Sequence, residues 1–132
     1  MRLLLDTHTF LWFIDGNPKL SSYARQLIEE LGNERLLSVA SLWEMSIKNS
    51  LGKLKLPLPF TKLVTEQVYG NAIELLHIAP EHLDVLRTLP FYHKDPFDRL
   101  ILAQSLSEDI PILSREKAFD DYAIRRFWNR ET

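Results

Sequence analysis

The sequence predicts an α/β protein with a mainly parallel sheet that is covered by helices on both faces. Short apolar runs rich in Leu, Ile and Val alternate along the chain with stretches whose apolar residues recur at helical spacing. Strands that alternate with helices are typical of parallel sheets. A continuous apolar run is typical of a strand that is buried on both faces. The order of the strands in the sheet does not follow from these observations.

In the first half of the chain, continuous apolar runs predict the strands and apolar spacing predicts the helices. Residues Arg2–Leu5 and Leu36–Val39 are short apolar runs of the kind found in buried strands. Residues Ser22–Leu31 carry large apolar side chains at helical spacing, and residues Ala40–Leu51 have an apolar residue at every fourth position. A glycine follows each helix as a plausible stop.

The second half of the chain continues the alternation. Residues 53–56 alternate lysine with leucine and then meet prolines, which predicts an exposed extended segment. Apolar spacing predicts a helix from Phe60 to Val68 that stops near Gly70, and Pro96 opens another helix that runs to Ser107. The remaining predicted elements are a strand at Ala72–Ile78, a short helix that opens at Pro80, a strand at Ile110–Leu113, a short helix at Glu116–Tyr122 and a strand at Ala123–Trp128.

The length and the composition fit one domain over residues 1–132. The chain has 132 residues, of which 45% are hydrophobic and 26% charged, as in globular proteins. This composition excludes disorder as the dominant state. The formal net charge is −2, which excludes a protein that coats nucleic acid by bulk electrostatics. Any chemistry on nucleic acid must therefore come from a local site.

Cysteine content and the N-terminal segment exclude further classes. The chain has no cysteine, so a disulfide framework, a thiolate zinc site and a cysteine nucleophile are excluded. Asp6 and His8 interrupt the N-terminal apolar run, which does not fit a secretory signal. No stretch approaches the roughly 18 apolar residues of a membrane span. We expect a cytoplasmic protein with no membrane contact.

Four carboxylates stand where predicted strands end or the following helices begin. Asp6 follows the first strand, and Glu44 lies in the first turns of the helix after the second strand. Asp98 lies in the first turn of the helix that opens at Pro96, and Glu116 follows a late strand. In a parallel α/β sheet these positions gather along one edge, where ligands bind. We therefore expect the four carboxylates to converge.

Converging carboxylates predict a bound divalent cation. Two unit charges about 4 Å apart cost on the order of 4 kcal/mol at an effective dielectric constant of 20, and a shared proton or a cation relieves that cost. Ligand sets made only of oxygen suit Mg²⁺ or Mn²⁺. Such an ion hydrolyses phosphodiesters by activating a water molecule and by stabilising charge on the leaving oxygen.

Three of the four acids also have a structural interpretation. Glu44 fits a capping box with Ser41, and it stands four residues before Lys48, as in a routine surface ion pair. Local chemistry favours this interpretation for Glu44. Asp6 is different, because an acid that ends a buried apolar run has no obvious capping role. For Asp6 the functional interpretation is favoured.

The late acids fit helix starts equally well. Asp95 fits an N-cap, and Asp98 fits the first turn of the same helix, where the helix dipole favours negative charge. Glu116 fits a first-turn acid after a cap at Ser114. For each of these residues, local chemistry alone favours the structural interpretation.

The histidines, aromatic residues and remaining basic residues define no site by themselves. His8 lies close to Asp6 in sequence, but a lone histidine near an apolar run is more often a hydrogen-bonded structural residue. His77, His82 and His93 show no metal-ligand spacing. The large aromatic residues favour the core over base stacking, and the basic clusters fit a solvated surface as well as phosphate binding. These residues are Trp12, Phe13, Trp43 and Trp128, and Lys53, Lys55, Arg125, Arg126 and Arg130.

Four segments together resemble a known family. LLLDTHTFLW at the start, SVASLWEMSIKNSLGKL, HKDPFDRLILAQS and PILSREKAFDDY stand in the order and spacing of a PIN domain. Within that superfamily the chain resembles VapC-type toxins of bacterial toxin–antitoxin pairs. The resemblance implies a three-layer α/β/α sandwich, an endoribonuclease site that depends on Mg²⁺ or Mn²⁺, a cognate antitoxin that blocks the site, and a homodimer.

The resemblance also assigns roles to residues. The first three acids of the family fall on Asp6, Glu44 and Asp98, and both Asp95 and His93 belong to the region around the third. The fourth is usually Asp in a T-x-D-like context, whereas this chain has Glu116 after a serine and an arginine. The expected catalytic and metal-binding residues are therefore Asp6, Glu44, Asp98 and Glu116.

Other functions fit the sequence less well. A phosphatase of the haloacid dehalogenase type needs a second Asp where this chain has His8, and Thr or Val where it has Phe10. A receiver-type signalling domain needs a phosphorylatable Asp at the end of a middle strand, which the sequence does not offer. The alternative from a non-enzyme class is a PIN-like module that binds RNA or protein without catalysis. The presence of all four acids argues against it.

Overall fold

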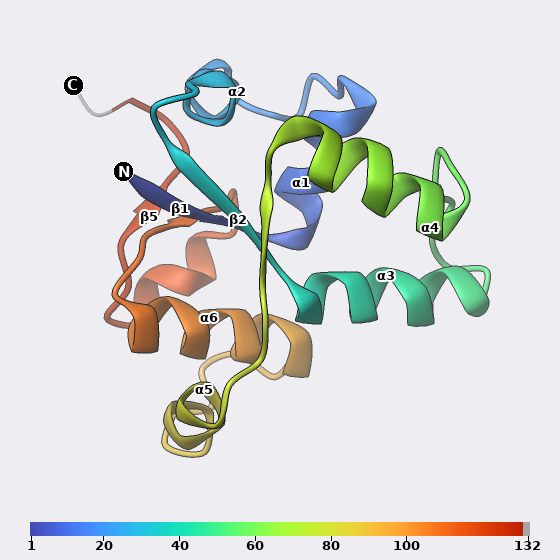
Figure 1. The fold of residues 1–132 in the computed structure, drawn as a ribbon. Helices are drawn as coiled ribbons and strands as arrows, with labels where there is room; N and C mark the ends of the chain where they lie inside the picture. Colours follow the sequence, from blue (N-terminus) through green and yellow to red (C-terminus); the bar gives the residue numbers. More distant parts are fainter. Residues whose placement is uncertain (131–132) are drawn as a thin grey trace.

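The computed structural model describes residues 1–130, and its centre is a five-stranded parallel sheet (Figure 1). The strand order is β3-β2-β1-β4-β5, so the chain starts in the middle of the sheet and extends it first to one side and then to the other. The parallel sheet that the sequence predicts is confirmed. The strands are β1 (Arg2–Leu5), β2 (Glu34–Ser38), β3 (Glu74–Leu76), β4 (Ile112–Leu113) and β5 (Arg126–Phe127).

Helices connect the strands and lie on both faces of the sheet (Figure 1). The α-helices are α1 (Thr7–Asp15), α2 (Ser22–Glu29), α3 (Val39–Ser50), α4 (Phe60–Leu63), α5 (Pro80–Leu86) and α6 (Pro96–Glu108). Helix α4 continues into the π-helical turn η1 (Val64–Val68) and the 3₁₀ turn η2 (Tyr69–Asn71), and a further 3₁₀ turn, η3 (Lys117–Asp121), precedes β5.

Alternate side chains of the central strand enter two separate cores. Leu3 and Leu5 of β1 pack with residues of α1, α2, α3 and α4, among them Phe10 and Ile28. Leu4 faces the opposite side and packs with α6 and with residues that follow β4. Because neighbouring side chains of a strand point to opposite faces, these two cores establish three layers, helix on sheet on helix. No helix in the described range 1–130 combines the length and the apolar character that a membrane crossing needs.

Helix α1 is absent from the sequence prediction. It begins directly after β1, with Asp6 as the N-cap residue whose side chain accepts a hydrogen bond from the Thr9 backbone N–H, and it ends at Gly16, where φ is +63°. The sequence from residue 10 to 14 is continuously apolar, so it shows no helical period. The expectation that Asp6 lacks a capping role was therefore wrong.

The apolar row on α3 faces outward, which the sequence prediction did not anticipate. Trp43 is 53% exposed and packs edge-to-face on Phe97, with 4.9 Å between the ring centroids. The placing of Trp43 in the core was wrong. The buried face of α3 lies beside the apolar row that contains Trp43. It consists of Ala40, Ser41, Leu42, Glu44 and Met45. Elsewhere, α2 ends two residues before its predicted end, and β3, β4 and β5 are shorter than predicted.

Candidate active site

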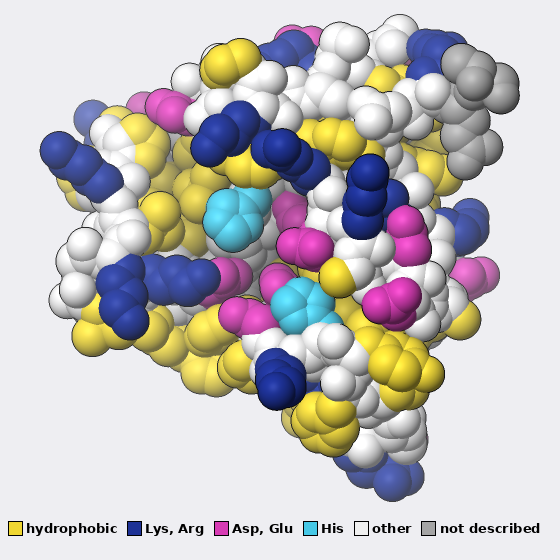
Figure 2. Space-filling model, turned by 180° about the vertical axis from the view of Figure 1, so that it is seen from behind, with side chains coloured by type: hydrophobic (Ala, Val, Ile, Leu, Met, Phe, Trp, Pro, Cys, Tyr) yellow, Lys and Arg dark blue, Asp and Glu magenta, His cyan; other side chains and the backbone are white. Residues whose placement is uncertain are grey.

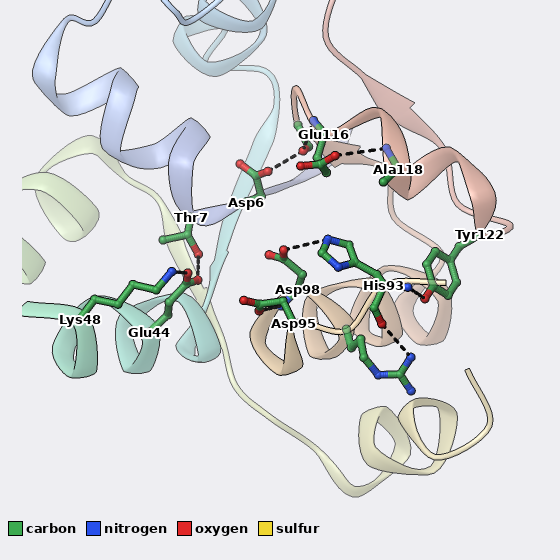
Figure 3. A network of polar contacts seen from close by, with 12 residues as sticks. Asp6, Thr7, Glu44, Lys48, His93, Asp95, Asp98, Glu116, Ala118 and Tyr122 are labelled. Carbon is green, nitrogen blue, oxygen red and sulfur yellow. Dashed lines mark hydrogen bonds and ion pairs between the residues drawn. The ribbon is translucent and has the colours of Figure 1, made fainter. Parts of the chain in front are cut away.

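The strand and helix arrangement brings the predicted acids to one edge of the sheet (Figure 3). Asp6 stands at the carboxyl end of β1, the central strand, and is only 7% exposed. One carboxylate oxygen accepts a hydrogen bond from the Thr9 backbone N–H at 2.8 Å, and the other accepts one from the Ser114 hydroxyl. Burial raises the pKa of Asp6 above its usual value, and the hydrogen bonds to Ser114 and Thr9 oppose that shift.

Glu44 projects from α3 into the same region and is 3% exposed. The Thr7 hydroxyl lies 2.8 Å from Oε1, and the Lys48 ammonium binds Oε2. The capping-box interpretation was wrong, because the N-cap of α3 is Ser38, whose hydroxyl accepts from the Ala40 backbone N–H. The pair with Lys48 is present as predicted, but its carboxylate is buried rather than on the surface.

Asp98 lies in the first turn of α6 with two polar neighbours. Asp95 is the N-cap of α6, and its side chain accepts from the Asp98 backbone N–H at 2.9 Å, which confirms the capping role of Asp95. His93 Nε2 lies 3.1 Å from Asp98 Oδ2. His93 lies in the loop between α5 and α6. Its backbone N–H donates a hydrogen bond to the Tyr122 hydroxyl at 2.9 Å, which holds the residue in place.

The fourth acid, Glu116, is exposed and lines a cavity of about 200 Å³ together with Asp6, His8, Trp12 and Arg115. Glu116 was predicted as a first-turn acid after a cap, but it is itself the N-cap of η3. Its side chain accepts a hydrogen bond from the Ala118 backbone N–H at 3.3 Å. His8 is exposed in this cavity and makes no hydrogen bond within the described part of the chain. The structural interpretation of His8 was therefore wrong.

The carboxylates act on one another electrostatically. Burial, followed by the charges of Asp95, Glu44, Asp6 and Glu116, raises the pKa of Asp98 to about 7. Acids that are far apart in sequence are therefore close enough in space for their negative charges to repel one another. Figure 2 shows the same feature on the surface, where Asp and Glu side chains gather around a hollow that is bordered by Lys and Arg side chains.

The acids around the hollow are ligands of the type that a hard divalent cation prefers, but in this structure their side chains do not converge on a single position. Between residues 1 and 130, no three Asp, Glu or His side chains lie close enough together to hold one ion. Asp6 and Glu44 are engaged instead with hydroxyl and ammonium groups. The donors around the hollow are mainly carboxylate oxygens, which suit Mg²⁺ or Mn²⁺. Positive charge would relieve the repulsion that adds to burial in raising the pKa of Asp98.

Comparison with family models adds the decisive observation. The model of the PIN domain family matches residues 3–125. The chain belongs to the PIN domain family. The match extends over nearly the whole chain and includes all four acids. PIN domains are typically nucleases, so membership supports a hydrolytic activity for this chain. A comparison with curated proteins found no significant match.

Solved structures with this PIN fold include toxin–antitoxin complexes. VapBC2 from Rickettsia felis, bound to a DNA fragment from its promoter, has a TM-score of 0.72 and 14% identity over 98% of this chain and 100% of that chain. FitAcB from Neisseria gonorrhoeae has a TM-score of 0.64 and 14% identity over 95% of this chain and 96% of that chain. A toxin–antitoxin complex from Klebsiella pneumoniae has a TM-score of 0.60 and 17% identity over 92% of each chain. At these identities the likeness shows a shared fold.

Sequence reasoning missed two polar partners of the acids, Thr7 beside Glu44 and Ser114 beside Asp6, and it predicted a third, Lys48. Thr7 has no sequence signal, because its contact to Glu44 joins residues 37 positions apart. Lys48 did have a signal, since it stands one helical turn after the acid, but the sequence does not show that the acid is buried.

Lys48→Met is expected to destabilise the metal-free protein by about 1–3 kcal/mol, because a buried charged acceptor then loses its partner. Lys48 Nζ is the only cation that pairs with Glu44 in the described residues. The hydrogen bond to Glu44, followed by the charges of Glu44, Asp95 and Asp98, raises the pKa of Lys48. Added Mg²⁺ should recover part of the loss. The measurement is thermal unfolding in EDTA and in Mg²⁺.

The control for this prediction is Lys62→Met. Lys62 forms the same kind of pair, with Glu66 at 3.6 Å, but both partners are exposed. Exposed pairs of this spacing contribute about 0.3–0.5 kcal/mol, so this variant should unfold like the wild type with and without Mg²⁺. Equal behaviour of the two variants would show that Lys48 has no special role.

Proposed function

We propose that this chain is a divalent-metal-dependent endoribonuclease that hydrolyses RNA phosphodiester bonds. The observation that carries the proposal is the presence of four acids from separate elements around one hollow of a PIN domain (Figure 3), where burial and then the neighbouring carboxylates raise the pKa of Asp98 to about 7. Asp6, Glu44, Asp98 and Glu116 would hold Mg²⁺ or Mn²⁺. When bound, such an ion lowers the pKa of water and stabilises charge on the leaving oxygen.

The protein's own contribution is to fix the acids before substrate arrives. Asp6 is held by the helix N-terminus that it caps and by Ser114, and Glu44 is held by Thr7. Buried, hydrogen-bonded side chains lose little further freedom when a ligand binds, which favours ordered geometry at the reacting phosphate. His93 Nε2 lies 3.1 Å from Asp98 Oδ2, where a protonated imidazole would attract that carboxylate.

The same proposal includes a biological role as the toxin of a toxin–antitoxin pair, active in the cytoplasm. It is supported by the likeness in fold to the toxin–antitoxin complexes of Rickettsia felis, Neisseria gonorrhoeae and Klebsiella pneumoniae. The partner is a cognate antitoxin protein that blocks the acidic site, and the active form is a homodimer. Expression of the chain alone in bacteria should arrest growth, and co-expression of the antitoxin should relieve the arrest. Normal growth at high soluble expression would contradict a toxin role.

The activity is tested with purified protein and structured RNA in Mg²⁺ or Mn²⁺, with EDTA as the control. Endonucleolytic fragments should form only with the metal. Cleavage that persists in EDTA would contradict the metal-dependent mechanism. Tight RNA binding without cleavage in either metal would support the alternative, a PIN-like module that binds RNA or protein without catalysis.

Glu116→Gln is expected to weaken cleavage and raise the Mg²⁺ requirement, but less than Asp6→Asn does. Glu116 is exposed and its longer side chain has one more torsion to order than Asp, whereas Mg²⁺ demands near-ideal geometry. Glu116→Asp should remain active. The measurement is cleavage rate against Mg²⁺ concentration for the wild type and the three variants. A Gln variant that matches the wild type throughout would leave Glu116 as a cap of η3 only.

A further inference from the structure

Within residues 1–130, Lys48 is the only lysine or arginine that forms an ion pair with any of the four predicted site acids. Asp6 accepts hydrogen bonds from a hydroxyl and a backbone N–H, and Glu116 accepts one from a backbone N–H. Asp98 pairs with a histidine, which is charged only when it is protonated. Among these partners, the Lys48 ammonium is therefore the one lasting positive charge.

Both oxygens of the Glu44 carboxylate are already occupied, by two partners of different kinds. Oε1 lies 2.8 Å from the Thr7 hydroxyl, and Oε2 binds the Lys48 ammonium. Thr7 is 4% exposed and its hydroxyl also lies 2.9 Å from Ser41 Oγ, so the protein encloses it. The Lys48 side chain is 36% exposed, and its flexible stem lets the ammonium move into solvent. Of the two partners, Lys48 is therefore the one that can leave.

Lys48 lies on the far side of Glu44 from the other acids. Figure 3 shows that Lys48 reaches the Glu44 carboxylate on the side away from Asp98. In the part of the chain that the structure describes, no three acidic or histidine side chains lie close enough together to hold one ion. A Glu44 carboxylate that turns toward Asp98 to complete such a group leaves its ammonium partner.

The Lys48 ammonium also lies within the electrostatic field of the site. The hydrogen bond to Glu44 is the largest cause that raises the pKa of Lys48, and the charges of Glu44, Asp95 and Asp98 add to it. An ammonium and a divalent cation that stabilise the same carboxylates repel each other. Each therefore reduces what the other contributes.

We propose that Lys48 is an internal competitor of the divalent cation: it neutralises Glu44 in the metal-free protein, has to release it when an ion binds, and so raises the Mg²⁺ concentration that the site requires. The inference rests on the proposed metal-dependent function and adds a residue that sets metal affinity without being a ligand. Any stability that Lys48 gives only to the metal-free protein is lost from the free energy of ion binding, because the two effects are linked.

The inference is tested by Mn²⁺ binding to the full chain without RNA. Free Mn²⁺ is measured from its electron paramagnetic resonance signal during titration of the wild type and the variants. Lys48→Met removes the ammonium and keeps a long side chain, and it should bind Mn²⁺ about tenfold more tightly than the wild type, within the usual range of coupling between two sites. Lys48→Gln keeps a neutral donor for Glu44 and should also bind more tightly, and it serves if Lys48→Met folds poorly without metal.

The matched control is Arg115→Met. Arg115 lines the cavity beside Asp6 and Glu116, but it forms no ion pair among residues 1–130. The control removes the same charge from the neighbourhood of the acids, and because its guanidinium is exposed and screened by salt, it should change the Mn²⁺ affinity much less. Equal tightening in both variants would show a general effect of charge, and it would overturn the inference.

Lys48→Arg tests whether the charge of Lys48 is responsible. An arginine keeps a positive charge one helical turn after Glu44, so its Mn²⁺ affinity should stay close to that of the wild type. An arginine variant that binds Mn²⁺ as tightly as Lys48→Met would show that the packing of the lysine limits binding, rather than its charge. That result would overturn the inference, as would equal Mn²⁺ affinity of the wild type and Lys48→Met.

RNA cleavage by the same variants separates this inference from the proposed function. Tighter Mn²⁺ binding by Lys48→Met, without cleavage by the wild type or the variant, would support the competitor and refute the nuclease. Metal-dependent cleavage by the wild type, with unchanged Mn²⁺ affinity in Lys48→Met, would refute the competitor and leave the nuclease intact. Where both hold, Lys48→Met should reach half of its maximal cleavage rate at a roughly tenfold lower Mg²⁺ concentration.

Discussion

Asp6→Asn and Asp98→Asn should each lower the RNA cleavage rate at least about a hundredfold in Mg²⁺. Loss of a residue that only supports a metal ligand already costs 10- to 100-fold, and these two carboxylates are proposed to bind the ion directly. Asparagine keeps the shape and hydrogen-bonding reach of the side chain but removes the charge. The measurement is single-turnover cleavage of one RNA, with circular dichroism to show that each variant is folded.

Asp98→Asn should also change stability, and in the opposite direction: it should lose activity but gain stability. Because the pKa of Asp98 is about 7 in the folded protein and about 4 when unfolded, the folded state holds a proton that the unfolded state has released. The contribution of Asp98 to stability is therefore greatest below about pH 4, and it is lost as the pH rises through 7. At pH 8 the charged carboxylate costs up to about 4 kcal/mol, so Asp98→Asn should unfold at a higher temperature than the wild type.

These two readouts separate a functional acid from a structural one. Without metal, Asp98→Asn should gain stability at pH 8 and gain little at pH 4, where the wild-type carboxyl is protonated. Mg²⁺ should raise the unfolding temperature of the wild type more than that of the variant. If Asp98→Asn loses both activity and stability at pH 8, the pair with His93 outweighs the repulsion, and Asp98 is mainly a structural residue.

The sequence predicted those elements whose pattern is local. The strand Arg2–Leu5 has the same bounds in the structure, and the helix that starts at Pro96 ends one residue after its predicted end. Both have strong signals, a short continuous apolar run and a proline at the first helical position. Strands β4 and β5 pair over two residues each, which is too short for an apolar run to define their ends.

Where the sequence failed, the deciding contact was tertiary. Trp43 continues a regular apolar row, but the buried face of α3 is the neighbouring one, which holds Glu44 instead. The role of Asp6 as a site residue stays a prediction, but one reason given for it, that an acid after a strand has no obvious capping role, was wrong. An N-cap and a functional carboxylate are compatible roles, because each oxygen of the side chain has its own partner.

Arg99 shows the same limit most clearly, since its sequence context contains no hint of its role. It is 5% exposed and has no acidic partner in the described residues. Its guanidinium donates instead to backbone carbonyls at the end of α5 and in the segment between α5 and α6, and it stacks on Phe91 at 3.9 Å from the ring centroid. The carbonyls are those of Leu86, Leu89, Pro90 and His93, at 2.8–3.4 Å.

Arg99→Met should lower the free energy of unfolding by about 1–3 kcal/mol, because the carbonyls of Leu89 and His93 lose their donor, whereas the other two carbonyls each keep a second one. The free energy of unfolding of Arg99→Lys should lie between those of the wild type and Arg99→Met, since an ammonium is compact and lacks the guanidinium's fixed fork of five donors. The measurement is urea unfolding, with Arg87→Met as the control. Arg87 is exposed and pairs with Asp84, so its loss should cost less than about 1 kcal/mol.

The consequence for the site lies in the loop that Arg99 holds. This loop carries His93 to within 3.1 Å of Asp98, and it is fastened at its other side by the Tyr122 hydroxyl, which donates to the Pro90 carbonyl at 2.7 Å. Amide exchange in residues 87–95 should therefore be faster in Arg99→Met than in the wild type, while exchange in β1 and β2 changes only as global stability does. Unchanged exchange in that segment would mean that Tyr122 alone fixes the loop, and that His93 reaches Asp98 without the arginine.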